Sequence, residues 1–160
     1  MKNTGQTRSQ NQWAMFDFTT SIRVRYADTD QMGYVYYGNY ARYFEIGRVE
    51  ALRSLGIAYK DLEASGVMMP VLENYSKYIR PALYDDMISL RVMIKEPPTA
   101  RIRFDYEITN ENGDLIHFGH TVLVFVSIAT KKVVAFPREL NEVILPFFEK
   151  RMDSNLAIKN

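Results

Sequence analysis

The sequence predicts a single α+β domain in which helices stand apart from a run of consecutive antiparallel strands. Apolar residues recur every three or four positions through 38–55, which is typical of a long helix. After residue 70 the pattern changes to alternation, and the turn-forming segment 110–114 joins two such runs. The length of 160 residues suits one domain with a substantial core.

The expected elements, in order, are a strand at 18–26, helices at 38–55 and 59–65, strands at 71–79, 86–95, 101–109 and 115–128, and a last helix from residue 137. In the first strand, Ile22, Val24 and Tyr26 share one face and are expected to be buried. Gly56 is expected to end the long helix, and Pro146 to kink or end the last one.

Bulk properties narrow the function classes. Residues 1–17 are expected to form a disordered extension, 18–150 the folded domain and 151–160 a tail. The net charge of +1 gives no general attraction to nucleic acid or to a membrane, so neither is expected as a partner. The lack of cysteine excludes disulfides and thiol nucleophiles and is compatible with a cytoplasmic location. No segment approaches the ~20 apolar residues that span a bilayer.

Two aspartates, Asp28 and Asp30, lie with Gly33 in a polar loop before the long helix. A calcium loop that begins at Asp28 would need ligands at Met32 and Asn39, but methionine cannot bind calcium and asparagine offers no bidentate carboxylate. A phosphate-binding loop would need more glycines and a lysine. No metal site is expected. Both aspartates could simply shape the loop through hydrogen bonds to backbone amides.

The start of the helix offers a second interpretation. Unpaired N–H groups around Tyr37, together with the positive end of the helix dipole, can stabilise an oxyanion. A carboxylate on the preceding loop can attack a thioester carbonyl or deprotonate water. This combination is suited to acyl transfer.

Residues 25–40, RYADTDQMGYVYYGNY, resemble the signature of hotdog-fold thioesterases of the 4-hydroxybenzoyl-CoA thioesterase type. The resemblance continues through 42–50 and 78–86 and covers the chain from about residue 18 to 148. It implies an antiparallel sheet of five to six strands wrapped around a long central helix. It also implies hydrolysis of an acyl-CoA with no cofactor, since coenzyme A is part of the substrate. Homodimers or homotetramers with the active site at the dimer interface are expected.

The same resemblance implies roles for individual residues. Asp30 matches the catalytic carboxylate, and Tyr37 supplies the backbone amide that polarises the thioester carbonyl. Gly33 matches the loop glycine, while Asn39 and Tyr40 match positions near the acyl pocket. Several relatives carry histidine where this chain has Tyr37. The role of the backbone amide does not depend on the side chain, so it is compatible with tyrosine, but a mechanism that uses an imidazole at this position is not supported.

Coenzyme A carries phosphates, so a cationic rim is expected. Lys131, Lys132 and Arg138 are the proposed binding residues, with Arg101 as a weaker addition. A solvated turn is the alternative explanation for the lysine pair.

Other side chains have competing explanations. Glu45 is either a substitute nucleophile or a partner of arginines within one helical turn. His117 and His120 are expected at the surface or at an interface. Two further functions remain open: hydrolysis of acyl groups on acyl carrier protein, and binding of acyl-CoA without turnover.

Overall fold

The computed structural model describes residues 15–149. Its main sheet has five antiparallel strands in the order β1-β4-β5-β6-β3, and β2 pairs with β7 in a small second sheet. The strands are β1 (Phe16–Arg23), β2 (Val67–Met68), β3 (Val71–Tyr78), β4 (Met87–Ile94), β5 (Arg101–Thr109), β6 (Leu115–Val124) and β7 (Val126–Ser127). The helices are η1 (Tyr26–Asp28), α1 (Asn39–Ser54), α2 (Tyr59–Ala64) and α3 (Arg138–Ile144). This arrangement confirms the predicted α+β class.

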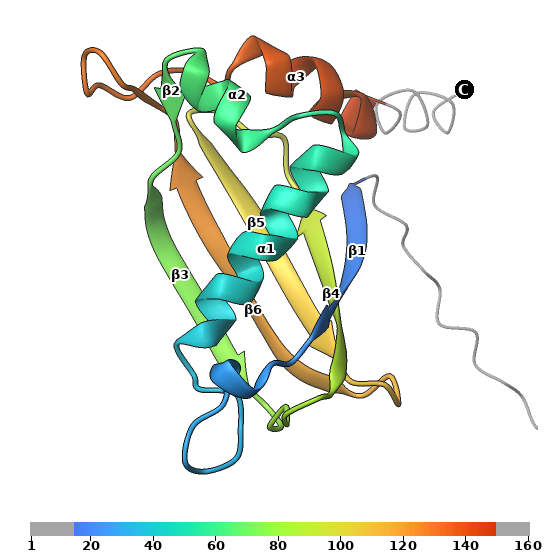
Figure 1. Cartoon of the computed structure of the whole chain (residues 1–160). Helices are drawn as coiled ribbons and strands as arrows, with labels where there is room; N and C mark the ends of the chain where they lie inside the picture. The colour runs from blue at the N-terminus through green and yellow to red at the C-terminus, as the bar shows by residue number, and fades with distance from the viewer. Residues whose placement is uncertain (1–14, 150–160) are drawn as a thin grey trace, which may run out of the picture.

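Helix α1 has 16 residues and lies across one face of the five-stranded sheet (Figure 1). The predicted apolar stripe is buried, and Tyr43 and Phe44 have no exposed surface. Gly47 allows close contact with β4, because a Cβ there would lie 2.5 Å from Cδ2 of Leu90. The helix ends at Ser54, and Gly56, the expected stop, follows two residues later with a φ of +82° and donates its N–H to the Arg53 carbonyl at 2.9 Å.

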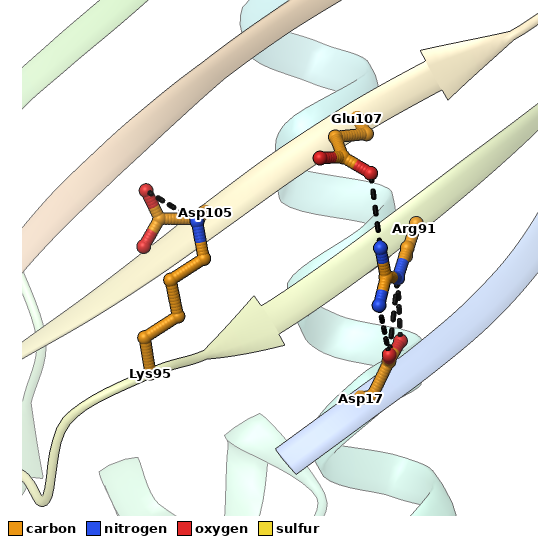
Figure 2. Close-up of polar contacts among 5 residues, drawn as sticks. All are labelled: Asp17, Arg91, Lys95, Asp105 and Glu107. Atoms are coloured by element: carbon orange, nitrogen blue, oxygen red, sulfur yellow. Dashed lines mark hydrogen bonds and ion pairs between the residues drawn. The ribbon is translucent and has the colours of Figure 1, made fainter. Parts of the chain in front are cut away.

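The two faces of the sheet differ in chemistry. Along β5, alternate residues are buried beneath α1, namely Ile102, Phe104, Tyr106 and Ile108. Charged side chains occupy the face turned away from α1, as Figure 2 shows. There Arg91 on β4 binds Asp17 on β1 at 3.0 Å and Glu107 on β5 at 3.1 Å. These charged groups form hydrogen bonds with one another across three strands, so this part of the outer face is polar and can remain in contact with solvent.

The first strand differs from its prediction. It ends at Arg23 rather than at residue 26, and Tyr26 is 79% exposed instead of buried. The reason is a local hydrogen bond: the carboxylate of Asp28 accepts the N–H of Arg25 at 2.9 Å and closes the turn η1. A side chain thereby competes with the strand ladder for the backbone.

The strand expected at 115–128 is divided into β6 and β7. At the break the N–H of Phe125 bonds the Ala100 carbonyl at 3.1 Å, and the chain then pairs with β2. Helices α1, α2 and α3 and strands β3, β4 and β5 match their expected positions to within a few residues.

At the ends of the chain, β1 begins at Phe16, inside the range expected to be an extension. The rest of that extension, residues 1–14, and the expected tail at 151–160 lie outside the described residues. Among the described residues, no helix is both long enough and apolar enough to cross a membrane.

Candidate active site

Asp28 connects the loop before α1 to the helix through hydrogen bonds. Its side chain is 1% exposed, and one carboxylate oxygen accepts the N–H of Arg25 at 2.9 Å and the hydroxyl of Tyr43 at 3.0 Å. Its carbonyl accepts the N–H of Tyr36 at 2.9 Å and the side-chain amide of Asn39 at 2.8 Å. With its carboxylate enclosed in this way, Asp28 serves the structure of the loop.

Asp30 occupies a tight turn two positions later. Its N–H donates to the Tyr34 carbonyl, and its own carbonyl accepts the N–H of Gly33, both at 2.9 Å. Gly33 has a φ of +82°, a conformation that side chains other than glycine rarely adopt. The Asp30 carboxylate accepts the N–H of Met32 at 2.9 Å and stays partly exposed beside a cavity. Its free oxygen can therefore reach a ligand, which the enclosed Asp28 cannot do.

The backbone at Tyr37 presents a free donor. Helix α1 begins at Asn39 after Gly38, and the Asn39 N–H donates to the Tyr36 carbonyl at 2.9 Å. The C=O and N–H of a trans peptide point in opposite directions, so this bond turns the Tyr37 N–H away from the helix. Within residues 15–149, no acceptor pairs with that N–H.

A cavity of about 270 Å³ brings the predicted catalytic pair together. It is lined by Asp30, Met32, Tyr34, Val35, Tyr37, Tyr40, Tyr78, Ile79, Arg80 and Pro81. Most of the lining side chains are aromatic or aliphatic, and the charged ones are the Asp30 carboxylate and the Arg80 guanidinium. A hollow of this kind suits an apolar group that ends in a reactive carbonyl.

The remaining predicted residues of the loop and helix have distinct positions. Tyr40 lines the cavity, and burial raises the pKa of its hydroxyl to about 12. The Asn39 side chain donates to the Asp28 carbonyl and does not line the cavity, so it supports the loop. Gly33 shapes the turn of Asp30 through its backbone.

The expected cationic rim lies elsewhere in the same copy of the chain. The turn that follows β7, which carries Lys131 and Lys132, and helix α3, which begins at Arg138, are at one end of the sheet. The loop before α1 is at the other end (Figure 1). Arg138 is also paired with Glu142 at 2.7 Å. A single copy therefore does not bring these three cations to Asp30.

Sequence reasoning missed Arg80, the cation that does line the cavity. It follows the end of β3 and pairs with Asp114 at 3.2 Å. It reaches the loop of Asp30 because strand β3 ends beside that loop, a consequence of sheet topology rather than of any local motif (Figure 1).

The expectation that His117 lies at the surface is wrong. This residue is fully buried on the face of β6 under α1, stacked on Tyr40 with ring centroids 4.0 Å apart. Its Nε2 is 3.1 Å from the Ser76 hydroxyl, and burial lowers its pKa to about 4. His120 is partly exposed and stacks on Tyr75 at 5.3 Å. The His117 ring is therefore uncharged near neutral pH, and it packs against Tyr40, which lines the cavity.

Glu45 does not line the cavity, and its carboxylate lies 4.0 Å from Arg48. This geometry favours the helix ion pair over the role of substitute nucleophile. In the described part of the chain, no group of three or more His, Cys, Asp or Glu side chains could hold a metal ion.

The chain is similar in sequence and in fold to known thioesterases. YneP of Bacillus subtilis, provisionally named an acyl-CoA thioesterase, is 37% identical over 94 residues, which are 59% of this chain and 68% of that protein. The acyl-CoA thioester hydrolase YbgC of Escherichia coli is 29% identical over 77% of this chain and 92% of its own length. The structure of a DHNA-CoA thioesterase from Staphylococcus aureus matches with a TM-score of 0.72 and 30% identity, over 90% of this chain and 93% of that one. The family model of the thioesterase-like superfamily matches residues 24–144, and the chain belongs to that superfamily.

Proposed function

We propose that this protein hydrolyses an acyl-CoA thioester to a free carboxylic acid and coenzyme A. The observation that carries the proposal is the cavity shared by the Asp30 carboxylate and Tyr37, whose N–H has no acceptor in the described structure. Relatives named as acyl-CoA thioester hydrolases support the choice of substrate class.

In the proposed reaction, the Tyr37 N–H donates a hydrogen bond to the thioester carbonyl oxygen. The negative charge that develops on this oxygen in the transition state strengthens that bond, which lowers the barrier. The partly exposed Asp30 carboxylate either attacks the carbonyl carbon or removes a proton from an attacking water. In the general-base route, the proton that Asp30 takes from water passes to the departing sulphur of coenzyme A. In the nucleophilic route, coenzyme A leaves as a thiolate, and the water that later cleaves the anhydride releases the proton that the thiolate takes up.

The two routes differ in the fate of the water oxygen. The nucleophilic route passes through a mixed anhydride with Asp30, which water then cleaves at the aspartyl carbonyl. A single turnover in ¹⁸O-labelled water would leave label in Asp30 by this route. Label found only in the product acid would exclude cleavage at the aspartyl carbonyl and favour Asp30 as a general base.

Substrate-binding roles follow from the position of each residue. Tyr40 forms part of the wall for the acyl group. Gly33 and Asn39 act through the loop, by shaping the turn of Asp30 and by holding the Asp28 carbonyl at 2.8 Å. No cofactor is required, since the chemistry needs only the carboxylate, the amide and water.

A panel of substrates tests the proposed function. Purified protein is assayed for thiol release from acyl-CoAs with short, long and aromatic acyl groups, and from the best acyl group carried on acyl carrier protein. Turnover of at least one acyl-CoA is expected. Faster turnover of the carrier-protein substrate would favour the acyl-carrier-protein alternative. Binding of acyl-CoA without thiol release would favour the alternative of a non-catalytic acyl-CoA binding protein.

The proposed enzyme is a dimer formed along β3. This edge strand presents unpaired backbone groups, and an edge of this kind commonly pairs with another chain. Large apolar side chains are also exposed along and just after it, namely Val71, Leu72, Tyr75, Tyr78 and Ile79. A second copy would cover both the edge and these side chains.

The charges on β3 favour one register. If two copies pair antiparallel with Tyr75 opposite the partner's Tyr75, then Glu73 lies opposite the partner's Lys77, and Lys77 opposite the partner's Glu73. Opposite charges that face each other across antiparallel strands stabilise the pair. The strand is therefore complementary to itself in this arrangement.

Such a dimer offers a role for the distant lysines. Antiparallel pairing places the end of one copy that carries Lys131 and Lys132 beside the end of its partner that carries Asp30. Arg138 lies at the same end as the lysines. We propose that these cations bind the phosphates of a coenzyme A whose thioester occupies the partner's cavity. Mixing an Asp30→Asn protein with a Lys131→Glu/Lys132→Glu protein should then restore activity, through mixed dimers that contain one intact site.

A further inference from the structure

Tyr78, the last residue of β3, connects the sheet to the turn that carries the proposed oxyanion donor. Its hydroxyl donates to the carbonyl of Tyr37 at 3.3 Å. Its ring meets the ring of Tyr37 edge-on, with centroids 6.5 Å apart, and the ring of Tyr40 with centroids 5.5 Å apart. It therefore touches the turn and the first residues of α1 together.

The peptide group that bears the Tyr37 N–H is held on each side by hydrogen bonds. Upstream, the Tyr36 N–H bonds the Asp28 carbonyl at 2.9 Å, and the Tyr36 carbonyl accepts the Asn39 N–H at 2.9 Å. Downstream, the Tyr37 carbonyl accepts the Tyr78 hydroxyl at 3.3 Å and the Tyr40 N–H at 3.4 Å. The other bonds come from the loop and the start of the helix, and the Tyr78 hydroxyl supplies the bond from the sheet.

Aromatic rings pack against Tyr78 from the side of the core. The ring of His117 lies edge-on to Tyr78 at 4.8 Å and is stacked on Tyr40 at 4.0 Å, with the two planes 7° apart. His117 is completely buried, and its Nε2 is 3.1 Å from the Ser76 hydroxyl. The tyrosine ring is therefore fixed from the side of the core, while its hydroxyl reaches the turn.

We propose that Tyr78 is a positioning residue, whose hydroxyl holds the Tyr37 backbone so that the Tyr37 N–H points at the thioester oxygen. This inference rests on the proposed function, in which that N–H stabilises the transition state. Donors to an oxyanion act through fixed geometry, and they lose effect when the backbone that carries them can move. The Tyr78 hydroxyl therefore acts through Tyr37 and need not touch the substrate itself.

The variant Tyr78→Phe tests this role, because it removes the hydroxyl and keeps the ring in the wall of the cavity. A neutral hydrogen bond contributes about 1 kcal/mol, so we expect kcat to fall about five-fold with little change in KM. Tyr84→Phe is the matched control: Tyr84 is exposed, packs against Tyr26 and does not line the cavity. A kcat for Tyr78→Phe equal to that of the control, or a change confined to KM, overturns the proposal.

A binding measurement separates this inference from the proposed function. Two unreactive analogues are compared: a ketone, with a methylene group in place of the thioester sulphur, and a thioether that lacks the carbonyl. The wild type should bind the ketone more tightly, because only the ketone accepts the Tyr37 N–H. Tyr78→Phe should reduce that preference, and Tyr84→Phe should preserve it.

Each other outcome identifies which claim fails. If the wild type shows no preference for the ketone, the oxyanion role of Tyr37 falls, and the role of Tyr78 falls with it. If the wild type and Tyr78→Phe show the same preference, Tyr37 retains its role and only the inference about Tyr78 is wrong.

Discussion

Asp28 and Asp30 show how two identical side chains in one loop acquire different roles. Composition and spacing leave both as loop-shaping residues or as catalytic candidates, and only the family resemblance favours Asp30. In the structure Asp28 is enclosed by Arg25, Tyr43 and the start of α1, whereas Asp30 borders the cavity. Part of the difference arises from packing against Tyr43, 15 residues along the chain, which composition and spacing alone do not reveal.

Removal of the Asp28 carboxylate is expected to weaken the fold. In Asp28→Ala the N–H of Arg25 and the hydroxyl of Tyr43 lose their acceptor, and the guanidinium of Arg42 loses a charge 3.6 Å away. The loss of a buried, hydrogen-bonded carboxylate costs about 3 kcal/mol in the free energy of unfolding. Urea denaturation measures it, with Asp30→Asn as the control, for which a change below about 1 kcal/mol is expected. Equal stability of the two variants would contradict the structural role of Asp28.

His117 gives the protein a specific dependence of stability on pH. Burial lowers the pKa of the folded residue from 6.5 to about 4, so the unfolded chain binds a proton more readily in this range. The contribution is complete above pH 6.5 and is lost as the pH falls toward 4, by about 1.4 kcal/mol per unit. His117→Phe should have a flatter profile over that window, and His120→Phe should keep the wild-type profile. Parallel profiles for the wild type and His117→Phe would show that the buried ring does not exclude the proton.

At the scale of elements, periodicity predicted most of the structure. Helix α1 and strands β4 and β5 match because each pattern reports directly which side faces the core. Strand β3 also matches, although nearly all its side chains are exposed. The end of β1 and the break between β6 and β7 were missed. They depend on hydrogen bonds to the Asp28 side chain and to the Ala100 carbonyl, which hydrophobic patterns do not encode.

The contact between α1 and β4 depends on Gly47. A Cβ at this position would lie 2.5 Å from Leu90 Cδ2 and 2.9 Å from Val92 Cγ2, so Gly47→Ala forces the helix or these side chains to move. Alanine favours a helix over glycine by about 1 kcal/mol, but overpacking costs about 1–3 kcal/mol, so a net loss of stability is expected. Thermal unfolding measures it, and adding Leu90→Ala should make the Gly47→Ala change less costly. A more stable single variant would show that the contact is loose.

For the whole molecule, the sequence alone predicted the class of fold and two residues that share the cavity, Asp30 and Tyr37, but it proposed a cationic rim without regard to distance. The turn that carries the two lysines and the loop that carries Asp30 are at opposite ends of the sheet (Figure 1), and Arg80 is the cation that lines the cavity. Only strand order and direction determine which ends meet, and those depend on pairing between segments far apart in the chain.

The proposed pairing along β3 predicts the effect of charge reversal. Glu73→Lys and Lys77→Glu each place like charges opposite each other in the dimer, so each should weaken association. The double variant restores opposite charges and should dimerise as the wild type does. Sedimentation over a range of concentrations measures this. Wild-type association in both single variants would exclude this register, and a wild type that is monomeric at all concentrations would exclude the dimer.

The most direct test of the central claim is the rate of thioester hydrolysis by Asp30→Asn, measured beside the wild type on its best acyl-CoA. Asparagine keeps the size of the side chain and can still accept the Met32 N–H, but it can neither attack the carbonyl nor act as a base. We expect kcat to fall by a factor of about 10² to 10⁴, with folding and ligand binding retained. Hydrolysis at the wild-type rate would show that the carboxylate of Asp30 does not perform the reaction.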